Sequence, residues 1–264
     1  MNKKRIDILL VERGLAESRN RAQRLVMAGE VRVNGEMVHK SSTQVPEDVQ
    51  IEIKKQPRYV SRGGLKLEAA VESFKVEIRG KVCADVGAST GGFTDCLLQN
   101  GAEKVYAIDV GYGVLHWKLR QDPRVIVMER TNARYLDALP ESVDLVTIDA
   151  SFISLALILP AVRAWFEGNS GQTIALIKPQ FEAGRKAAAV HAGVIKDEVV
   201  HERVLMETLS SAHVLGFWPM GLIPSPIRGP KGNVEFLVDL SLERHDIPFD
   251  MERLVQQALQ AIPE

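Results

Sequence analysis

The chain reads Asp85-Val86-Gly87-Ala88-Ser89-Thr90-Gly91-Gly92-Phe93-Thr94 where an apolar run, residues 82–84, gives way to apolar residues at helical spacing, 96–98. This order predicts a buried strand, a tight glycine turn and the N-terminus of a helix. A second predicted strand, residues 104–108, ends in Asp109. Glycines let the backbone approach a ligand closely, and a carboxylate at the next strand tip can bind both hydroxyl groups of a ribose. The pattern therefore favours a nucleotide-like ligand over a purely structural turn.

The spacing of the glycines narrows the choice of ligand. Dinucleotide sites usually have the pattern G-x-G-x-x-G, with a pyrophosphate at the helix N-terminus. Here the order is Gly87-x-x-x-Gly91-Gly92, and Asp85 stands just before the first glycine. A carboxylate there would repel a diphosphate, whereas it suits a ligand that carries an ammonium and a sulfonium group. The turn therefore favours S-adenosylmethionine (SAM) as the cofactor.

Charge is distributed unevenly along the 264 residues. Residues 1–62 contain 13 Lys and Arg against 8 Asp and Glu, a net charge of +5, whereas the remainder carries −6. A basic first quarter on an acidic body predicts a polyanion-binding module attached to a second domain. Chance alone would also produce such an asymmetry, so the charge does not decide the question.

Cysteine, histidine and apolar patterns exclude several other classes of protein. Cys83 and Cys96 lie on the predicted strand and helix, where buried small hydrophobes are expected rather than a disulfide or a metal site. The six histidines show no paired spacing, so we expect no bound metal. The longest apolar run, residues 155–162, is far shorter than the roughly 20 residues that cross a bilayer, and the basic N-terminus lacks a signal-peptide pattern. We therefore expect a cytoplasmic protein without membrane association.

The first 56 residues predict a small α+β domain. Helical patterns cover residues 5–13 and the segment that follows Ser18, a candidate N-cap, and Asn34-Gly35 is a turn signal for a hairpin. Two short helices are therefore expected to pack on a small sheet. Basic side chains are expected on one exposed surface of this domain: Arg19, Arg21, Arg24, Arg32 and Lys40.

This pattern resembles the small RNA-binding domain first described in a ribosomal small-subunit protein, the S-four type. The matching residues are Arg5-Ile6-Asp7-x-Leu9-Leu10-Val11, Gly14-Leu15, Ser18-Arg19-x-x-Ala22 and Gly29-x-Val31-x-Val33-Asn34-Gly35. The resemblance implies binding to structured RNA through shape and phosphate contacts. The candidate RNA contacts are Arg5, Arg19, Arg21, Arg24, Arg32 and Lys40. Residues 57–64, with a proline at one end and two glycines at the other, are the predicted linker.

Residues 65–245 alternate helix and strand signals. Strands are predicted at 82–86, 104–109, 125–128, 144–149 and 172–178, with helices between them. A late pair of strands, near 214–223 and 234–240, lacks a long intervening helix, which predicts an antiparallel edge hairpin. The predicted fold class is α/β, a Rossmann-like, mostly parallel and doubly wound sheet in which ligands bind beyond the carboxyl ends of the strands. Residues 246–264 are expected to hold a C-terminal helix.

Four charged residues are candidates for catalysis. Asp149 and Lys178 each follow an apolar strand, Glu235 begins another, and Lys66 lies in the helix before the sheet. A helix cap or a solvated strand end explains any one of these charges about as well as catalysis does. The inference of an active site therefore depends on all four residues together. Methylation of an alcohol needs a base. Lys178, with Lys66 nearby, can lose a proton to water and then accept one from a sugar hydroxyl, while the two carboxylates orient it.

In order and context, Lys66, Asp149, Lys178 and Glu235 match the Lys-Asp-Lys-Glu motif of the FtsJ-type ribose 2′-O-methyltransferases, which the body of the chain resembles. With the small domain and residues 61–67, 85–93, 129–132 and 177–182, the whole chain resembles the TlyA (hemolysin A) family. The resemblance implies SAM as cofactor and ribosomal RNA as substrate, with 2′-O-methylation of cytidine. It implies SAM contacts at Asp85, Gly87, Ser89, Gly91, Gly92, Phe93, Asp109, Asn132 and Asp149. Asn132 stands where the FtsJ pattern usually has an aspartate.

Two other functions are kept as alternatives: a membrane-active hemolysin, from the family's other name, and an RNA-binding protein without catalysis. The first lacks a spanning segment, and the complete set of charged residues argues against the second. The run Asp149-Ala150-Ser151-Phe152 differs from the Asn/Asp-Pro-Pro-aromatic run of amino-group methyltransferases, and no cysteine stands at a strand tip as carbon-5 cytosine enzymes require. An oxygen target is therefore expected. Residues 182–199 are expected to cover the substrate, with Arg185, Lys186 and Lys196 near phosphate.

Overall fold

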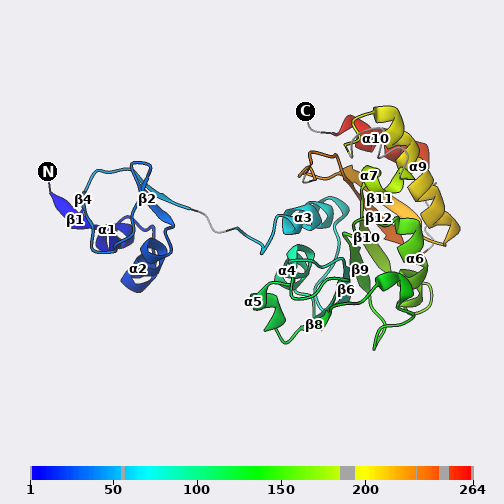
Figure 1. Ribbon diagram of the computed structural model, residues 1–264, viewed down its shortest axis with the longest axis horizontal. Helices are drawn as coiled ribbons and strands as arrows, with labels where there is room; N and C mark the ends of the chain where they lie inside the picture. Colours follow the sequence, from blue (N-terminus) through cyan, green and yellow to red (C-terminus); the bar gives the residue numbers. More distant parts are fainter. Residues whose placement is uncertain (1, 55–56, 185–193, 230, 244–249, 263–264) are drawn as a thin grey trace. The chain divides into compact units, whose positions relative to one another are not determined.

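The structure is a computed structural model that describes residues 2–54, 57–184, 194–229, 231–243 and 250–262. It divides into two compact units, Met1–Pro57 and Arg58–Glu264 (Figure 1). The boundary expected between residues 245 and 246 lies outside the described residues, as do residues 185–193 of the expected substrate-covering segment.

The first unit is a small α+β fold. Its helices are α1 (Ile6–Glu12) and α2 (Arg19–Met27). Its strands are β1 (Lys3–Arg5), β2 (Val31–Val33), β3 (Glu36–Met37), β4 (Gln44–Pro46) and β5 (Ile51–Ile53). Strand β2 is the centre of an antiparallel sheet of order β3-β2-β5, and β1 pairs with β4.

The local sequence of the first unit explains where its second helix begins and which face it buries. The hydroxyl of Ser18 accepts a hydrogen bond from the Arg21 N–H at 3.2 Å, as expected for an N-cap. Ala22 and Val26, one helical turn apart, are fully buried and pack with Ile6 and Leu10 of α1. The small unit therefore has a hydrophobic core of its own.

The second unit is built on a seven-stranded sheet of order β11-β12-β10-β9-β6-β7-β8. The strands are β6 (Val82–Val86), β7 (Lys104–Ile108), β8 (Val125–Met128), β9 (Leu145–Ile148), β10 (Gln172–Ile177), β11 (Trp218–Pro224) and β12 (Phe236–Ser241). The first five are parallel, and β12 runs antiparallel to both β10 and β11. The predicted fold class, a mostly parallel sheet with an antiparallel edge hairpin, is confirmed.

Helices cover both faces of this sheet (Figure 1). Helices α3 (Gly63–Phe74), α4 (Gly92–Gln99) and α5 (Trp117–Arg120) lie on one side, and α6 (Leu155–Ala164), α9 (Glu198–Val214) and α10 (Met251–Gln260) on the other. A short 3-10 helix, η1 (Ala133–Tyr135), follows β8, and α7 (Pro179–Glu182) follows β10.

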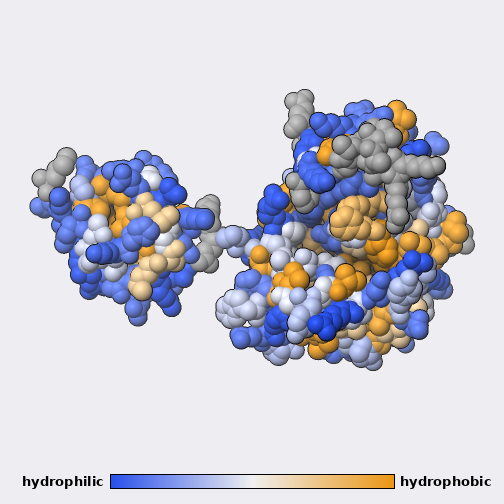
Figure 2. All heavy atoms as spheres, in the orientation of Figure 1, coloured by the Kyte–Doolittle hydropathy of each residue, from blue (hydrophilic) through white to orange (hydrophobic). Residues whose placement is uncertain are grey.

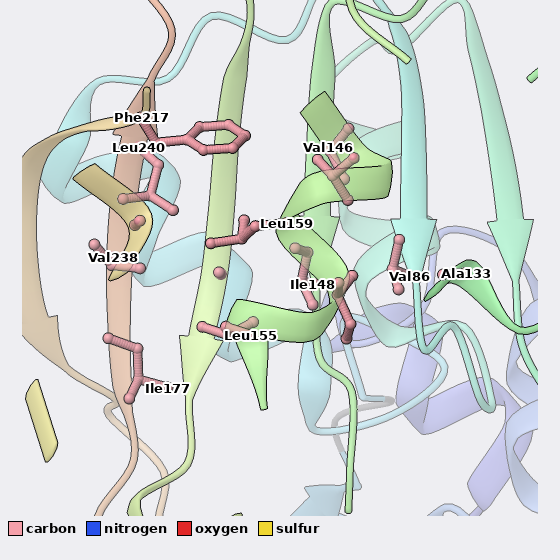
Figure 3. Packing of buried hydrophobic residues seen from close by; sticks show 14 of the residues in the cluster. Val86, Ala133, Val146, Ile148, Leu155, Leu159, Ile177, Phe217, Val238 and Leu240 are labelled. Carbon is pink, nitrogen blue, oxygen red and sulfur yellow. The ribbon is translucent and has the colours of Figure 1, made fainter. Parts of the chain in front are cut away.

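Side chains of the central strands alternate between the two cores. Leu145 packs in the core beneath α3 and α4, whereas Val146 and Ile148 pack in the core beneath α6 and α9. Figure 3 shows the second of these cores, where Leu155 and Leu159 of α6 lie against the strand residues. Because the central strands are buried on both faces, most of their residues are apolar, and the buried polar residues within β6 and β9 are Asp85 and Thr147.

Helix α9 is not among the elements expected from the sequence. The Asp197 carboxylate caps this helix by accepting the Val199 N–H at 2.9 Å. Its buried residues, Val204, Leu205, Leu209 and Ala212, recur at helical spacing. Both signals stand in the sequence, so the helix was predictable from its cap and its period.

Part of the predicted linker, residues 57–64, packs on the second unit. Tyr59 is buried, and the Val60 N–H donates to Oδ2 of Asp95 at 2.9 Å. Helix α3 already begins at Gly63, and a Cβ on Gly64 would lie 2.3 Å from the Tyr59 ring. The ring therefore packs on bare helix backbone, which attaches this part of the segment to the second unit.

Candidate active site

Three of the four candidate catalytic residues lie at one edge of the sheet because of strand direction. Asp149 directly follows β9, and Lys178 directly follows β10. These strands are parallel neighbours, so their carboxyl ends meet at the same edge. Glu235 directly precedes β12, which runs antiparallel to β10 with Phe236 opposite Ile177. This register places Glu235 beside the end of β10.

Lys66 reaches the same edge from α3, whose N-terminus packs closely on that of α4. A Cβ on Gly92 would lie 2.8 Å from the Gly64 nitrogen, so glycine is required for this approach. Nζ of Lys66 lies 2.5 Å from Oε2 of Glu235. Both side chains are buried, with residue exposures of 9% and 1%.

The second ion pair joins Lys178 to Asp149. Nζ of Lys178 lies 2.5 Å from Oδ1 of Asp149 and donates to Oγ of Ser151 at 2.9 Å. Lys178 is 8% exposed. The four residues therefore form two lysine–carboxylate pairs, and each pair has a further polar neighbour, since the Gln180 side-chain amide donates to Glu235 at 3.3 Å.

One cavity of about 240 Å³ reaches both ion pairs, because Lys66 and Asp149 line it together. The other lining residues come from three segments: Ser61, Arg62 and Gly63 before and at the start of α3; Gly87, Ala88, Ser89, Thr90, Gly92 and Phe93 of the glycine turn; and Ile227, Arg228 and Gly229 before β12. Four of the expected SAM contacts in the turn, Gly87, Ser89, Gly92 and Phe93, thus face the same space as Lys66.

The backbone of the glycine turn has the shape of a ligand cradle. Gly87 has φ +82° and Gly91, the N-cap of α4, has φ +97°, which side-chain-bearing residues rarely adopt. A Cβ on Gly87 would lie 2.8 Å from the carbonyl oxygen of Asp149. The turn and the backbone of Asp149 therefore touch directly, and a small group bound against the turn lies beside Asp149.

Asp109 is held in a fixed position at the end of β7. Its carboxylate accepts the Ser89 N–H at 2.8 Å and the Gly111 N–H at 2.6 Å. An ionised carboxylate accepts about four hydrogen bonds, so two positions are left for the hydroxyl groups of a ribose. The next residue, Val110, is 69% exposed, as an apolar surface for a planar base would be. These residues fit an adenosyl group, so the site is compatible with SAM.

Asp85 does not line the cavity, which differs from the expected SAM contact. Its carboxyl group is fully buried beneath the turn, where it accepts the Thr94 hydroxyl at 2.6 Å and the Thr147 hydroxyl at 3.3 Å. Burial raises the pKa of Asp85 to about 7. The residue before Gly87 therefore supports the turn from below, because the strand alternation points it into the core.

Gly91, Asp109 and Asn132 also lie outside the lining of this cavity. Oδ1 of Asn132 accepts the Arg134 N–H at 3.1 Å and caps η1, and the residue is exposed. The Thr131 N–H donates to the Asp109 carbonyl at 3.0 Å, so the two segments are adjacent. The expected adenine contact is thus placed next to the expected ribose contact, although its amide oxygen already has a partner.

Two residues at the site were missed as functional candidates. Ser151 contacts Lys178, and Phe152 has φ +65° and is 89% exposed, with its ring centroid 4.8 Å from that of Phe181. Both stand in the run after Asp149 that served only to exclude a nitrogen target. A large apolar ring beyond a catalytic strand tip was the available signal, but a left-handed, exposed phenylalanine is not predictable from the sequence.

The candidate RNA contacts of the first unit differ in their surroundings. Arg24, Arg32 and Lys40 are exposed, and Arg21 is partly buried. Arg32 donates to the Gly35 carbonyl at 2.9 Å. Arg5 and Arg19 instead form ion pairs with Asp7, at 3.0 and 3.1 Å.

Features of metal-binding and membrane-spanning proteins are absent from the part of the chain that the structure describes. Among the described residues there is no group of three or more His, Cys, Asp or Glu side chains that could hold a metal ion. No described helix is both long enough and apolar enough to cross a membrane.

Known proteins share both units. The FtsJ-like methyltransferase family matches residues 59–242, and the S4 domain matches residues 4–51. The 16S/23S rRNA (cytidine-2'-O)-methyltransferase TlyA of Mycobacterium tuberculosis is 44% identical over 89% of this chain and 88% of its own length. Hemolysin A of Brachyspira hyodysenteriae is 41% identical over 88% of this chain and 98% of its own.

Solved structures are also similar to this chain. A candidate hemolysin from Streptococcus thermophilus has a TM-score of 0.72 at 44% identity and covers 99% of this chain and 97% of its own. A candidate SAM-dependent methyltransferase from Listeria monocytogenes has a TM-score of 0.53 at 15% identity over 69% of this chain and 99% of its own, which shows the fold alone. The family match over most of the chain and the identity of these relatives agree: the chain belongs to the TlyA (hemolysin A) family, in which an S4 domain precedes an FtsJ-like methyltransferase domain.

Proposed function

We propose that this protein transfers a methyl group from SAM to the ribose 2′-hydroxyl of a cytidine in ribosomal RNA. The observation that carries the proposal is the pairing of Lys66 with Glu235 and of Lys178 with Asp149 around one cavity that also includes the glycine turn. The name of the Mycobacterium tuberculosis relative gives the nucleotide and the RNA. A ribosomal RNA substrate in turn implies a cytoplasmic protein.

SAM, when bound, supplies an electrophilic methyl group on a positively charged sulfur. The chain must bring a hydroxyl to that methyl group and remove the proton of the hydroxyl. Lys178 is the proposed general base, since its Nζ lies at the strand tip between Asp149 and Ser151. General-base catalysis of this kind contributes about 10²–10⁴-fold to the rate.

The two carboxylates have different proposed roles. Asp149 holds the Lys178 side chain in place and lies against the glycine turn, so it fixes the base relative to the cofactor. Glu235 holds Lys66, which lines the same cavity as Asp149. Orientation of the hydroxyl by such a fixed group contributes at least as much as proton transfer.

Phe152 is the proposed contact for the target base. Its ring is 89% exposed, three residues after Asp149, and it is supported from behind by Phe181. Nζ of Lys178 lies 5.8 Å from the Phe181 ring centroid, so the aromatic pair borders the proposed base. Enzymes that modify nucleotides hold an unstacked base against aromatic side chains. A cytosine stacked on Phe152 would bring its own ribose toward Lys178.

Incubation of ribosomal subunits from a strain lacking this gene with radiolabelled SAM and the protein tests the proposal. The expected result is label in ribosomal RNA that maps to an alkali-resistant linkage, because a 2′-O-methyl group blocks cleavage by the neighbouring hydroxyl. Label that maps to a base, or no transfer to either subunit, would refute the proposed function.

A further inference from the structure

We infer that Asp7 is a positioning residue for RNA binding: its buried carboxylate holds Arg5 and Arg19 so that both guanidinium groups present their outer nitrogens to RNA phosphates. The inference deepens the proposed function and depends on it for the identity of the ligand. Asp7 is fully buried, although it lies in the first turn of α1 in a unit of fewer than sixty residues.

Four hydrogen bonds converge on this carboxylate. Arg5 donates through Nε to Oδ1 and through Nη2 to Oδ2, both at 3.0 Å. Arg19 donates through Nε to Oδ2 at 3.1 Å, and the Gln23 side-chain amide donates to the same oxygen at 3.0 Å. The bond from Arg5 is the largest cause that holds the pKa of Asp7 well below its usual range, so the carboxylate is ionised in the folded protein.

The geometry leaves the phosphate-binding ends of both arginines available. Arg19 contacts Asp7 only through Nε, and Arg5 uses one edge of its guanidinium group. Their side chains are 55% and 34% exposed, and among the described residues neither Nη atom of Arg19 has another bonded partner. A guanidinium group held by its Nε edge presents its Nη nitrogens outward, in the fork that binds phosphate oxygens in pairs.

The surroundings favour an anionic partner. Two arginines and one carboxylate leave a net positive charge at the cluster. The other charged residues of α2, the helix that begins with Arg19, are Arg21 and Arg24, which are also basic. Hydrophilic residues cover much of this unit on the face seen in Figure 2. An arginine side chain loses much of its freedom when it binds a phosphate, so a carboxylate that fixes it beforehand raises affinity.

This role predicts a change in RNA affinity opposite in direction to the change that net charge alone would cause. Asp7→Asn makes the unit more positive, so charge alone would strengthen binding to a polyanion. If Asp7 positions the arginines, the variant instead binds more weakly, by about tenfold. The matched control is Asp48→Asn, which changes the net charge equally at an exposed acid that, within the described residues, contacts no arginine.

The experiment measures binding of the full chain to transcribed ribosomal RNA without SAM, over a series of salt concentrations. The expected result is weaker binding by Asp7→Asn and equal or tighter binding by Asp48→Asn. The slope of log affinity against log salt should also fall by about two for Asp7→Asn, one for each arginine fork released. Equal or tighter binding by Asp7→Asn, with the small unit shown to be folded by amide hydrogen exchange, overturns the inference.

Arg19→Lys provides a second test should Asp7→Asn unfold the small unit. Lysine keeps the charge, and Asp7 keeps its bonds to Arg5 and Gln23, but one ammonium group cannot both hold the carboxylate edge and present a fork. We expect Arg19→Lys to lose nearly as much affinity as Arg19→Gln, and wild-type affinity for Arg19→Lys overturns the inference. If the wild type binds ribosomal RNA and the variants bind it equally well, only this inference is refuted. If the wild type does not bind ribosomal RNA, the result counts against the proposed function.

Discussion

Nζ of Lys66 lies 2.5 Å from Oε2 of Glu235, although 169 residues separate the two in the sequence. The pair joins α3 to the first residue before β12 and is nearly inaccessible to solvent. The loop before β12 passes close to it, because a Cβ on Gly229 would lie 2.6 Å from Oε1 of Glu235. This contact therefore closes one side of the cavity with residues from both ends of the second unit.

Breaking this buried pair should destabilise the second unit. Glu235→Gln leaves the Lys66 charge buried without its partner, and we expect the free energy of unfolding to fall by about 3 kcal/mol. Denaturation followed by tryptophan fluorescence measures it, because all three tryptophans lie in the second unit. Glu141→Gln, which breaks the exposed pair with Lys104, should change stability by less than about 1 kcal/mol. Equal effects of the two variants would contradict the account.

Gly87→Ala should disturb both the binding of SAM and the position of the general base, Lys178. Gly87→Ala has to adopt φ +82° and places a Cβ 2.8 Å from the Asp149 carbonyl, so either the turn or the strand tip moves. We expect methyl transfer to fall by about 10²-fold, the effect of a displacement of about 1 Å in an active site. Gly168→Ala, with φ +62° and open space around its Cβ, is the matched control. Activity of the Gly87 variant at the level of this control would be inconsistent with the geometry.

Removal of the Phe152 ring should weaken use of the RNA substrate. Stacking of a base on an aromatic ring contributes about 1–3 kcal/mol, so we expect kcat/KM for ribosomal subunits to fall by about tenfold or more in Phe152→Ala. SAM affinity, measured by calorimetry, should be unchanged, because Phe152 does not line the cavity. Phe152→Leu keeps an apolar surface and should lose less. An unaltered kcat/KM in the alanine variant would remove Phe152 from the proposed substrate contact.

The Asp85 carboxyl group should make stability depend on pH. Its pKa is about 7 in the folded chain against 3.8 ordinarily, so the folded state binds this proton more tightly than the unfolded state. Ionisation therefore destabilises the fold progressively as pH rises from about 4 to about 7, and the penalty is constant above that range. Asp85→Asn has no such ionisation. Relative to the wild type, the free energy of unfolding of the variant should rise by up to about 4 kcal/mol between about pH 4 and pH 8.

Denaturation at several pH values, with wild type and variant compared at each, isolates this group because other titrations cancel. Asn can still accept the Thr94 hydroxyl, so the comparison changes the charge more than the packing. A stability difference that does not vary with pH would show that the buried carboxyl group is not the one that titrates.

Much of the second unit was predictable because its strands are buried on both faces. Runs such as residues 145–148 and 172–177 are mainly apolar and are followed by a charged residue, so both the strand and the position of Asp149 or Lys178 at its tip follow from the sequence. Side-chain contacts between distant segments of the chain were not predictable in this way. That Glu235 binds Lys66 rather than Lys178 depends on how α3 packs on α4, which no local pattern encodes.

Side-chain alternation along β6 also explains why Asp85 is buried and does not line the cavity. Asp85 is one residue before the end of β6, so its side chain points into a core while the turn after it faces the cavity. Arg19 is exposed at the start of α2, as expected, but its contact with Asp7, shared with Arg5, could not be expected, because it joins the starts of two different helices.

Methyl transfer by Lys178→Ala tests the central claim most directly. Transfer from radiolabelled SAM to ribosomal subunits should fall by at least about 10²-fold while SAM affinity is retained, since the side chain lies at the proposed position of the base. Lys104→Ala is the matched control, because Lys104 begins β7 and so lies at the edge of the sheet opposite the site. This variant should transfer methyl groups at the wild-type rate. Transfer by Lys178→Ala at a rate close to that of Lys104→Ala would contradict the account.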